Sequence, residues 1–241
     1  MIGIAYLFFE SFILINRHDV EEAKHIELGK KYHSLCLFPM GEGVLIDSDW
    51  VLTAGYIGND LKKDLQVGYK PKATIEANDY EIERVIVNPE YRPDENDLAL
   101  VKLKTPVRNV VSAKLYTQNS ETGKLISIVG LGDTSDGISG PAHWDKIIHG
   151  ATNTVDGADD EWIWFDFDKP GSPGGTELEG IGAVNDIGGP AYIEENNEQY
   201  VAGISSHQDD AGHEKGTYGV IEYYTRISKY ADWINDVMNK N

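Results

Sequence analysis

Short apolar runs, separated by turn residues at near-regular intervals, constrain the fold of this chain more than any other feature of its sequence. Few segments repeat apolar residues with the period of a long helix. Turn-forming pairs such as Asn88-Pro89 and Gly132-Asp133 lie between the runs. This spacing is typical of an all-β sandwich or barrel and not of alternating βαβ units. The expected strands are residues 43–46, 50–53, 83–87, 98–103, 125–131, 161–167, 199–204 and 219–224.

The C-terminal segment is the only one with a clear helical pattern. From Ser228 onward, Tyr230, Ile234 and Val237 follow one another at spacings of four and three residues, which places them on one face of a helix. We therefore expect one terminal helix beside an otherwise β-structure.

An apolar stretch at residues 2–15, which contains Glu10, lies near the start of the sequence. It is too short to cross a membrane as a helix, and it lacks the basic n-region and the small-residue cleavage site of a complete signal peptide. We interpret residues 1–14 as a degenerate or truncated signal peptide, with a buried N-terminal strand or helix as the alternative. The first interpretation predicts a secreted or periplasmic protein.

The chain is strongly acidic and has one cysteine. It carries 21 Lys and Arg residues against 40 Asp and Glu residues, a formal net charge of −19. Such a surface repels phosphate groups, so neither nucleic acid nor a membrane surface is an expected partner. Solubility is the simpler explanation of this charge, and a basic partner is the alternative. The single Cys36 excludes an internal disulfide, and a chain of this length is stable with a hydrophobic core alone.

Three short segments carry an ordered set of motifs. Residues 43–56 read GVLIDSDWVLTAGY, residues 96–103 read NDLALVKL, and residues 185–190 read NDIGGP. In order and spacing these segments resemble the trypsin and chymotrypsin family of serine proteases. There the first segment ends in the catalytic histidine, the second contains the catalytic aspartate, and the third contains the nucleophilic serine.

Supporting matches extend the resemblance from about residue 15 to residue 237. They are VGLG at 129–132, VAGISS at 201–206 and the tail that begins YTRISKY at 224–230. The resemblance implies an all-β fold of two six-stranded antiparallel Greek-key barrels, with a cleft between them and a C-terminal helix outside. We place this domain at residues 15–241 and the boundary between the barrels near residues 110–125.

Two of the three catalytic positions that the resemblance defines hold residues without the required chemistry. Tyr56 stands at the histidine position, and a phenol with a pKa of about 10 stays protonated at neutral pH and does not accept the proton of the nucleophile. Ile187 stands at the serine position and has no nucleophilic atom. Asp97 stands at the aspartate position, where a buried and hydrogen-bonded carboxylate would stabilise the fold even without catalysis.

The residues before Ile187 match the family only in part. Asn185 stands where the family has the glycine whose backbone N–H contributes to the oxyanion hole, and Asn tolerates a positive φ better than most residues do. The family counterpart of Asp186 pairs with the new N-terminal amine after activation cleavage. Counting back from Tyr56 places that amine at Ile15. The resemblance also places Cys36 at one half of a common disulfide whose partner position is Ile57, so we expect a buried free thiol.

The resemblance also defines a specificity pocket. It places Ile181 at the base, Ser205 at the edge, and His207 where the family usually has a tryptophan. We therefore expect an apolar pocket that does not select Lys or Arg. Residues 207–214 form an H-x-D-D-x-x-H-E pattern, which we interpret as a solvated acidic loop and not as a metal site. No metal and no cofactor is expected.

These observations predict an inactive homologue of a trypsin-like protease, a monomer that binds a peptide or protein in the cleft between the barrels. One alternative is a family member with residual or different hydrolase activity that uses other cleft residues, such as His207 as a base. A degenerate homologue without a specific role is the other alternative.

Overall fold

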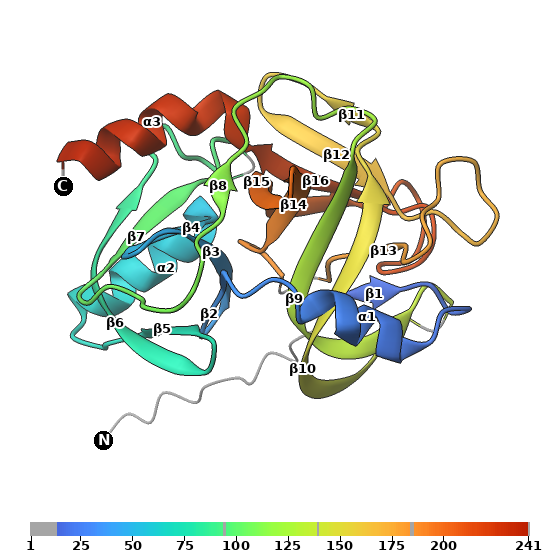
Figure 1. Ribbon diagram of the computed structural model, residues 1–241, viewed down its shortest axis with the longest axis horizontal. Coiled ribbons are helices and arrows are strands. Elements are labelled where there is room, and N and C mark those ends of the chain that lie inside the picture. The colour runs from blue at the N-terminus through green and yellow to red at the C-terminus, as the bar shows by residue number, and fades with distance from the viewer. Residues whose placement is uncertain (1–13, 94, 139, 184–185, 241) are drawn as a thin grey trace.

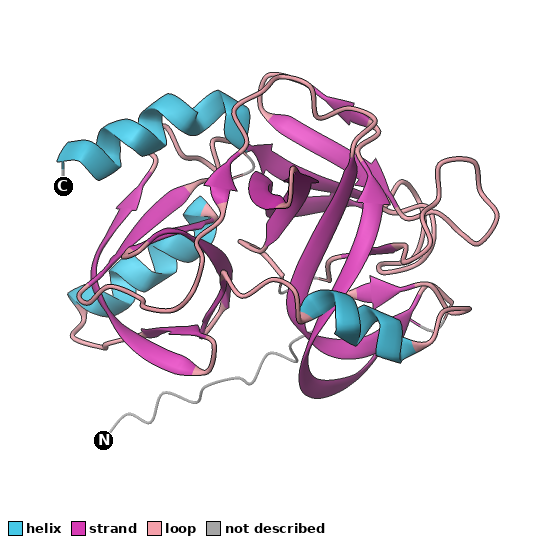
Figure 2. Ribbon diagram, viewed as in Figure 1, coloured by secondary structure: helices cyan, strands magenta, loops and turns pink. Residues whose placement is uncertain are grey.

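The computed structural model describes residues 14–93, 95–138, 140–183 and 186–240. Two β-units lie side by side in it (Figure 1). Strands are the main regular element of both units, and the C-terminal helix runs along the left-hand unit (Figure 2). No helix in the described ranges is long and apolar enough to cross a bilayer.

The first unit is a closed barrel with the strand order β2-β3-β4-β7-β6-β5. Its centre is apolar, with Val44, Leu52 and Leu100 completely buried. Alternation is clearest in the fifth strand, where Ala73 and Ile75 point inward between half-exposed neighbours. The strands are β2 (Leu35–Phe38), β3 (Gly41–Asp47), β4 (Trp50–Thr53), β5 (Lys72–Ile75), β6 (Asn78–Val87) and β7 (Ala99–Leu103).

The second unit is a ten-stranded sheet with the order β11-β12-β16-β15-β14-β9-β1-β13, in which β10 pairs with β9 and β8 pairs with β15. Phe165, Phe167 and Tyr224 fill its core. The strands are β1 (Ile15–Asn16), β8 (Lys114–Leu115), β9 (Leu125–Asp136), β10 (Gly140–Thr154), β11 (Gly157–Ala158), β12 (Trp162–Asp166), β13 (Gly180–Ile181), β14 (Pro190–Glu195), β15 (Glu198–Asp209) and β16 (Ile221–Arg226).

The expected fold class is confirmed, since two β-units and a C-terminal helix, α3 (Ile227–Lys240), are present. Every expected strand overlaps an observed one, and residues 50–53 coincide with β4. The chain passes from the first unit to the second between β7 and β8, because β8 pairs with β15.

The expectation that only the C-terminus is helical is wrong. Helix α1 (Glu22–Gly29) packs on β10, and α2 (Gly55–Gln66) follows β4. In α2 the buried Ile57 and Leu61 are four residues apart, which makes one face apolar. In α1 the terminal Gly29 lies so close to the sheet that a Cβ atom there would be 2.7 Å from the carbonyl carbon of His149.

The start of the described chain belongs to the second unit. Leu14 is 1% exposed, and Ile15 pairs with Ile181 on one side and with Ser135 on the other. Leu14, the last residue of the expected N-terminal segment, is therefore part of the core of the second unit. Residues 1–13, on which the signal-peptide interpretation depends, lie outside the described residues.

Candidate functional site

Asp97, which directly precedes Leu98 and strand β7, joins the two units and is 4% exposed. Its Oδ1 accepts a hydrogen bond from the backbone N–H of Tyr56 at 2.9 Å, and its Oδ2 accepts one from the Ser206 hydroxyl at 2.7 Å. Its carbonyl oxygen accepts a third from the Thr225 hydroxyl at 2.9 Å. Ser206 and Thr225 belong to β15 and β16, so this residue of the first unit is anchored in the second.

Tyr56 lies in the first turn of α2, and its backbone N–H is the group that donates to Asp97. The phenol ring is 47% exposed. Met40, at the start of the neighbouring hairpin, is also exposed, at 53%. The position that the resemblance assigns to a base therefore presents an apolar ring to solvent.

The turn that contains Ile187 is tightly held by backbone hydrogen bonds. The carbonyl oxygen of Ile187 accepts from the N–H of Glu42 at 3.0 Å, and the N–H of Gly188 donates to the carbonyl oxygen of Ser205 at 2.9 Å. Gly188 has a φ of +90°, and a Cβ atom there would collide with the carbonyl oxygen of Glu42 and the hydroxyl of Thr53. Asn185, the predicted oxyanion-hole residue, lies outside the described residues.

A cavity of about 290 Å³ opens beside this turn. It brings together three of the predicted site residues, namely Ile187, Ser205 and His207, but not Ile181. Ile181 is completely buried in the core of the second unit, where β13 pairs with β1. The cavity lining consists of Ala183, Ile187, Ser205, Ser206, His207, Gln208, Asp210, Lys215 and Glu222.

Glu222 makes the expectation of an apolar pocket wrong. The side chain is 1% exposed, and its Oε2 accepts a hydrogen bond from the N–H of Gly182 at 2.7 Å. Burial raises the pKa of Glu222 to about 7. Sequence reasoning missed this residue, although Glu222 and the buried Tyr224 are two apart in β16 and must share a face of the sheet.

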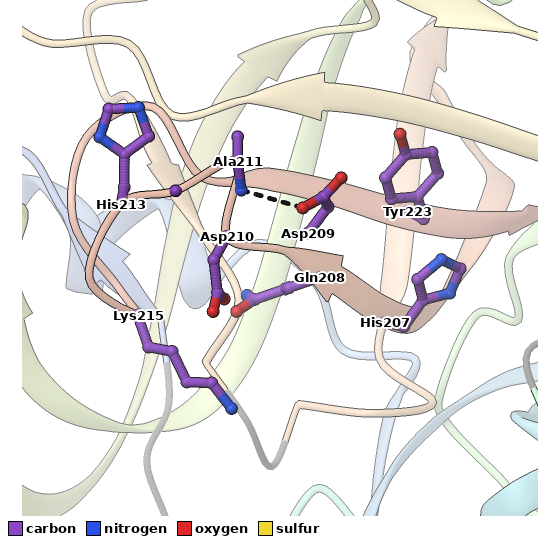
Figure 3. A pocket seen from close by; sticks show the side chains of 9 residues that line it. His207, Gln208, Asp209, Asp210, Ala211, His213, Lys215 and Tyr223 are labelled. Carbon is purple, nitrogen blue, oxygen red and sulfur yellow. Dashed lines mark hydrogen bonds between the residues drawn. The ribbon is translucent and has the colours of Figure 1, made fainter.

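His207 is fixed in the wall of the cavity by aromatic contacts. Its ring stacks on Tyr223 at 4.9 Å between centroids, and Trp162 meets it edge-on at 4.8 Å. Its Nδ1 lies 3.4 Å from the Ser206 hydroxyl. A wider and more open depression continues from the cavity along the loop after β15. Figure 3 shows it, with His207, Gln208, Asp209, Asp210, Ala211, His213, Lys215 and Tyr223 labelled around it.

Asp186 is buried, and the backbone of Leu14, one residue before the expected Ile15, contacts its carboxyl. Pairing of Asp186 with a free amine at Ile15 stays a prediction. Oδ2 of Asp186 accepts a hydrogen bond from the N–H of Ala183 at 2.8 Å. Burial and the neighbouring carboxyls of Glu42 and Glu222 raise the pKa of Asp186 well above its usual value, while backbone contacts from Ala183 and Leu14 oppose this.

Cys36 is a buried free thiol, but it does not face Ile57 as the resemblance implies. It pairs with Gly43 in the β2–β3 hairpin. Gly41 is the residue opposite Ile57, since a Cβ atom there would lie 2.5 Å from its Cδ1. The alignment of Cys36 with a disulfide position is therefore wrong, because Gly41 lies against Ile57 and Cys36 is five residues before it.

The expectation of a loop over residues 207–214 is wrong for its first three residues, since residues 207–209 form the end of β15 and only residues 210–214 form a loop. Among the residues that the structure describes, no three His, Cys, Asp or Glu side chains are grouped as metal ligands. Asp209 Oδ1 instead accepts a hydrogen bond from the N–H of Ala211 at 2.9 Å.

Comparison with known proteins agrees with the fold. The family described as Trypsin matches residues 30–163. The complement C1s subcomponent of Sus scrofa is 31% identical over 238 residues, covering 84% of this chain and 33% of that protein. The urokinase-type plasminogen activator of Gallus gallus is 26% identical over 225 residues, covering 82% of this chain and 50% of that protein. The chain thus spans between a third and a half of the length of these relatives. It belongs to the trypsin-like serine protease family.

Proposed function

We propose that this protein is an inactive member of its family that binds a peptide or protein segment in the cleft between the two units. The observation that carries the proposal is the Ile187 turn. Its hydrogen bonds to Glu42 and Ser205 keep an ordered loop beside an open cavity, yet the residue presented there is an alkyl side chain.

The chemistry of peptide hydrolysis needs a nucleophile and a base that act together. Ile187 supplies no hydroxyl, and Tyr56 supplies a protonated phenol in place of an imidazole. The two deficits are independent. Asp97 can orient a base only where one is present, and it is engaged by Ser206 and by the backbone of Tyr56.

The cavity and its rim indicate the kind of ligand. Glu222 and Ser205 provide polar groups inside, and Lys215 and Asp210 lie at the mouth without an ion-pair partner among the described residues. Tyr56, exposed in the first turn of α2, adds an aromatic surface on the first unit. We infer an extended peptide that inserts one polar side chain and packs apolar residues against the rim.

Selection from a displayed peptide library, followed by fluorescence anisotropy, tests this proposal. Ile187→Trp should fill the cavity and weaken the selected peptides at least tenfold, whereas Leu125→Trp, at an exposed position in the second unit, should not. Equal affinity for the wild type and the Ile187→Trp variant would contradict binding in the cleft. Fluorophosphonate probes should label neither protein.

A hydrolase that uses other cleft residues is the second candidate, favoured by the contact between His207 and Ser206. The Ser206 hydroxyl, however, donates its only proton to Asp97, so it does not donate to His207 as an activated nucleophile would. Hydrolysis of an activated ester that is lost in both His207→Ala and Ser206→Ala would favour this candidate over the binding role.

We also propose that the protein is an exported monomer. Light scattering on a purified sample should give the 26.7 kDa mass of one chain. Export is tested by cell fractionation with and without residues 1–13, and retention of both forms in the cytoplasm would contradict it.

A further inference from the structure

Glu42 connects the first unit to the second through both its backbone and its side chain. It lies in β3 and is 4% exposed. Its N–H donates to the carbonyl oxygen of Ile187 at 3.0 Å, and its Oε1 accepts from the N–H of Leu131 in β9 at 2.8 Å. A carboxyl group is thus built into the contact between the units, directly behind the Ile187 turn.

Two buried carboxyl oxygens at this contact have no hydrogen-bond partner among the described residues. They are Oε2 of Glu42 and Oδ1 of Asp186. Gly189 separates the two residues, since a Cβ atom there would lie 2.7 Å from Oε2 of Glu42 and 3.0 Å from the carbonyl oxygen of Asp186. Buried carboxylate oxygens without donors are costly when they are charged, because neither water nor protein compensates the charge.

The surroundings of this pair hold acids and no base. No basic side chain in the described parts of the chain forms a hydrogen bond or an ion pair with either carboxyl. Burial raises the pKa of Glu42 to about 8, and Glu42 in turn helps to raise that of Asp186. The titratable groups that face Glu42 are Cys36 from β2, Tyr192 from β14, Tyr224 from β16, and Asp186. Glu222 from β16 faces Asp186.

We propose that Glu42 and Asp186 form a proton-dependent lock, which holds the Ile187 turn and the Leu14–Asn16 segment in their buried positions in the intact chain. The lock is closed while at least one of the two carboxyls is protonated. It opens when both are ionised, because two adjacent negative charges without a cation repel each other in a region that excludes water.

The hydrogen bonds determine which part moves. Glu42 lies within strand β3 of the barrel, where the Thr53 hydroxyl donates to its carbonyl oxygen at 2.5 Å. Its side chain also accepts the bond from Leu131 in β9. Asp186 lies in a short turn outside the regular strands, and its carboxyl is held by backbone contacts from Ala183 and Leu14. Repulsion therefore displaces the Asp186 side, and with it the Ile187 turn and the contact with Leu14. Opening changes the wall of the cavity without any cleavage of the chain.

Amide hydrogen exchange, corrected for the intrinsic rate at each pH, tests the lock. The reporting amides are those of Gly188, Gly189 and Ser205, which are hydrogen-bonded within the turn. Between pH 6 and pH 9 their protection factors should fall at least tenfold in the wild type and stay within twofold in Glu42→Gln. Glu179→Gln, which removes a buried carboxyl outside the pair, should show the same fall in protection factors as the wild type.

The proposal would be overturned if the protection factors of these amides had the same pH dependence in the wild type and in Glu42→Gln. Protection that sodium chloride restores at pH 9 and choline chloride does not would also overturn it, because the site would then hold a cation and not a proton. Should Glu42→Gln fail to fold, the carboxyl ¹³C shifts of the wild type decide. Titration of Glu42 above pH 7 supports the lock, and titration near pH 4.5, the ordinary value, refutes it.

Discussion

The Ser206 hydroxyl donates a 2.7 Å hydrogen bond to Oδ2 of Asp97, and this bond ties β15 to the segment that leads into β7. Together with the hydrogen bond from the backbone N–H of Tyr56, this bond engages both carboxylate oxygens of Asp97. The aspartate that the chain retains is thus part of the contact between the two units, whatever happens at positions 56 and 187.

Replacing Asp97 should therefore affect stability even though no catalysis is at stake. In Asp97→Ala the N–H of Tyr56 and the hydroxyl of Ser206 both lose their acceptor, which should cost roughly 2–4 kcal/mol. Ser206→Ala removes one bond and should cost about 1–2 kcal/mol. Urea denaturation of the two variants measures the difference, and an Asp97→Ala variant as stable as the wild type would rule out the structural role.

Gly188 should be far less replaceable than a glycine of similar backbone conformation elsewhere. Gly188 and Gly212 have φ values of +90° and +84°, but only at Gly188 would a Cβ atom meet other atoms within 4 Å. Gly212→Ala should lower the free energy of unfolding by about 1 kcal/mol, through backbone strain alone. Gly188→Ala should lower the free energy of unfolding by roughly 3 kcal/mol or more, because the Ile187 turn must also move away from Glu42. Thermal or urea unfolding of both variants provides the test.

The buried acids predict that the protein is most stable at mildly acidic pH. A folded-state pKa of about 8 for Glu42, against an ordinary value of 4.5, means that the folded state binds this proton more tightly. The resulting stabilisation is complete below pH 4.5 and is lost as the pH rises to 8, a loss on the order of 4 kcal/mol. Glu222, with a pKa of about 7, acts in the same direction.

Glu42→Gln should remove this part of the pH dependence. Urea midpoints at pH 5 and pH 8.5 should converge in the variant, which at pH 8.5 should be more stable than the wild type. A variant that is less stable than the wild type at both values would show that the carboxyl contributes through its hydrogen bond to Leu131 alone.

Restoring the two catalytic residues should give little activity. Tyr56→His or Ile187→Ser alone should be inactive, because the members of the triad act as a unit. The double variant still carries Asn185, and one misdirected oxyanion donor costs about 10²–10³ in rate. Adding Asn185→Gly should therefore improve it. Peptide hydrolysis by full chains and by chains that begin at Leu14 should be compared, since a free amine at Leu14 would lie beside Asp186. A folded triple variant that is inert in both forms would show that the scaffold itself has diverged.

The sequence predicts this fold well where apolar runs and motifs coincide, as in residues 50–53, where motif and strand have the same limits. It predicts the fold less well where the lengths of the segments between motifs determine which residues meet. The count back from Tyr56 to Ile15 crosses α1 and the β2–β3 hairpin, whose lengths the motif does not define. Helix α2 escaped notice because Gly55 and Gly58, poor helix formers, flank the short apolar pair of Ile57 and Leu61.

The sequence also does not reveal the buried acids Glu42 and Glu222, and the reason is chemical. A glutamate in a strand is normally taken as an outward residue, and neither Glu42 nor Glu222 has a sequence neighbour that reveals its partner. Each accepts a hydrogen bond from a backbone N–H of a distant segment, Leu131 for Glu42 and Gly182 for Glu222. Only the assembled units bring these donors into position.

The pairing of Ile15 with Ser135 and Ile181 also constrains the order in which the protein is built during synthesis. The first barrel needs no strand beyond Leu103, so it is complete in sequence while the ribosome has yet to make most of the second unit. Strand β1, which precedes that barrel, finds its last neighbour only when residue 181 has emerged. The earliest part of the described chain is thus among the last to be fixed, and a nascent chain must keep Leu14 and Ile15 from aggregating until then.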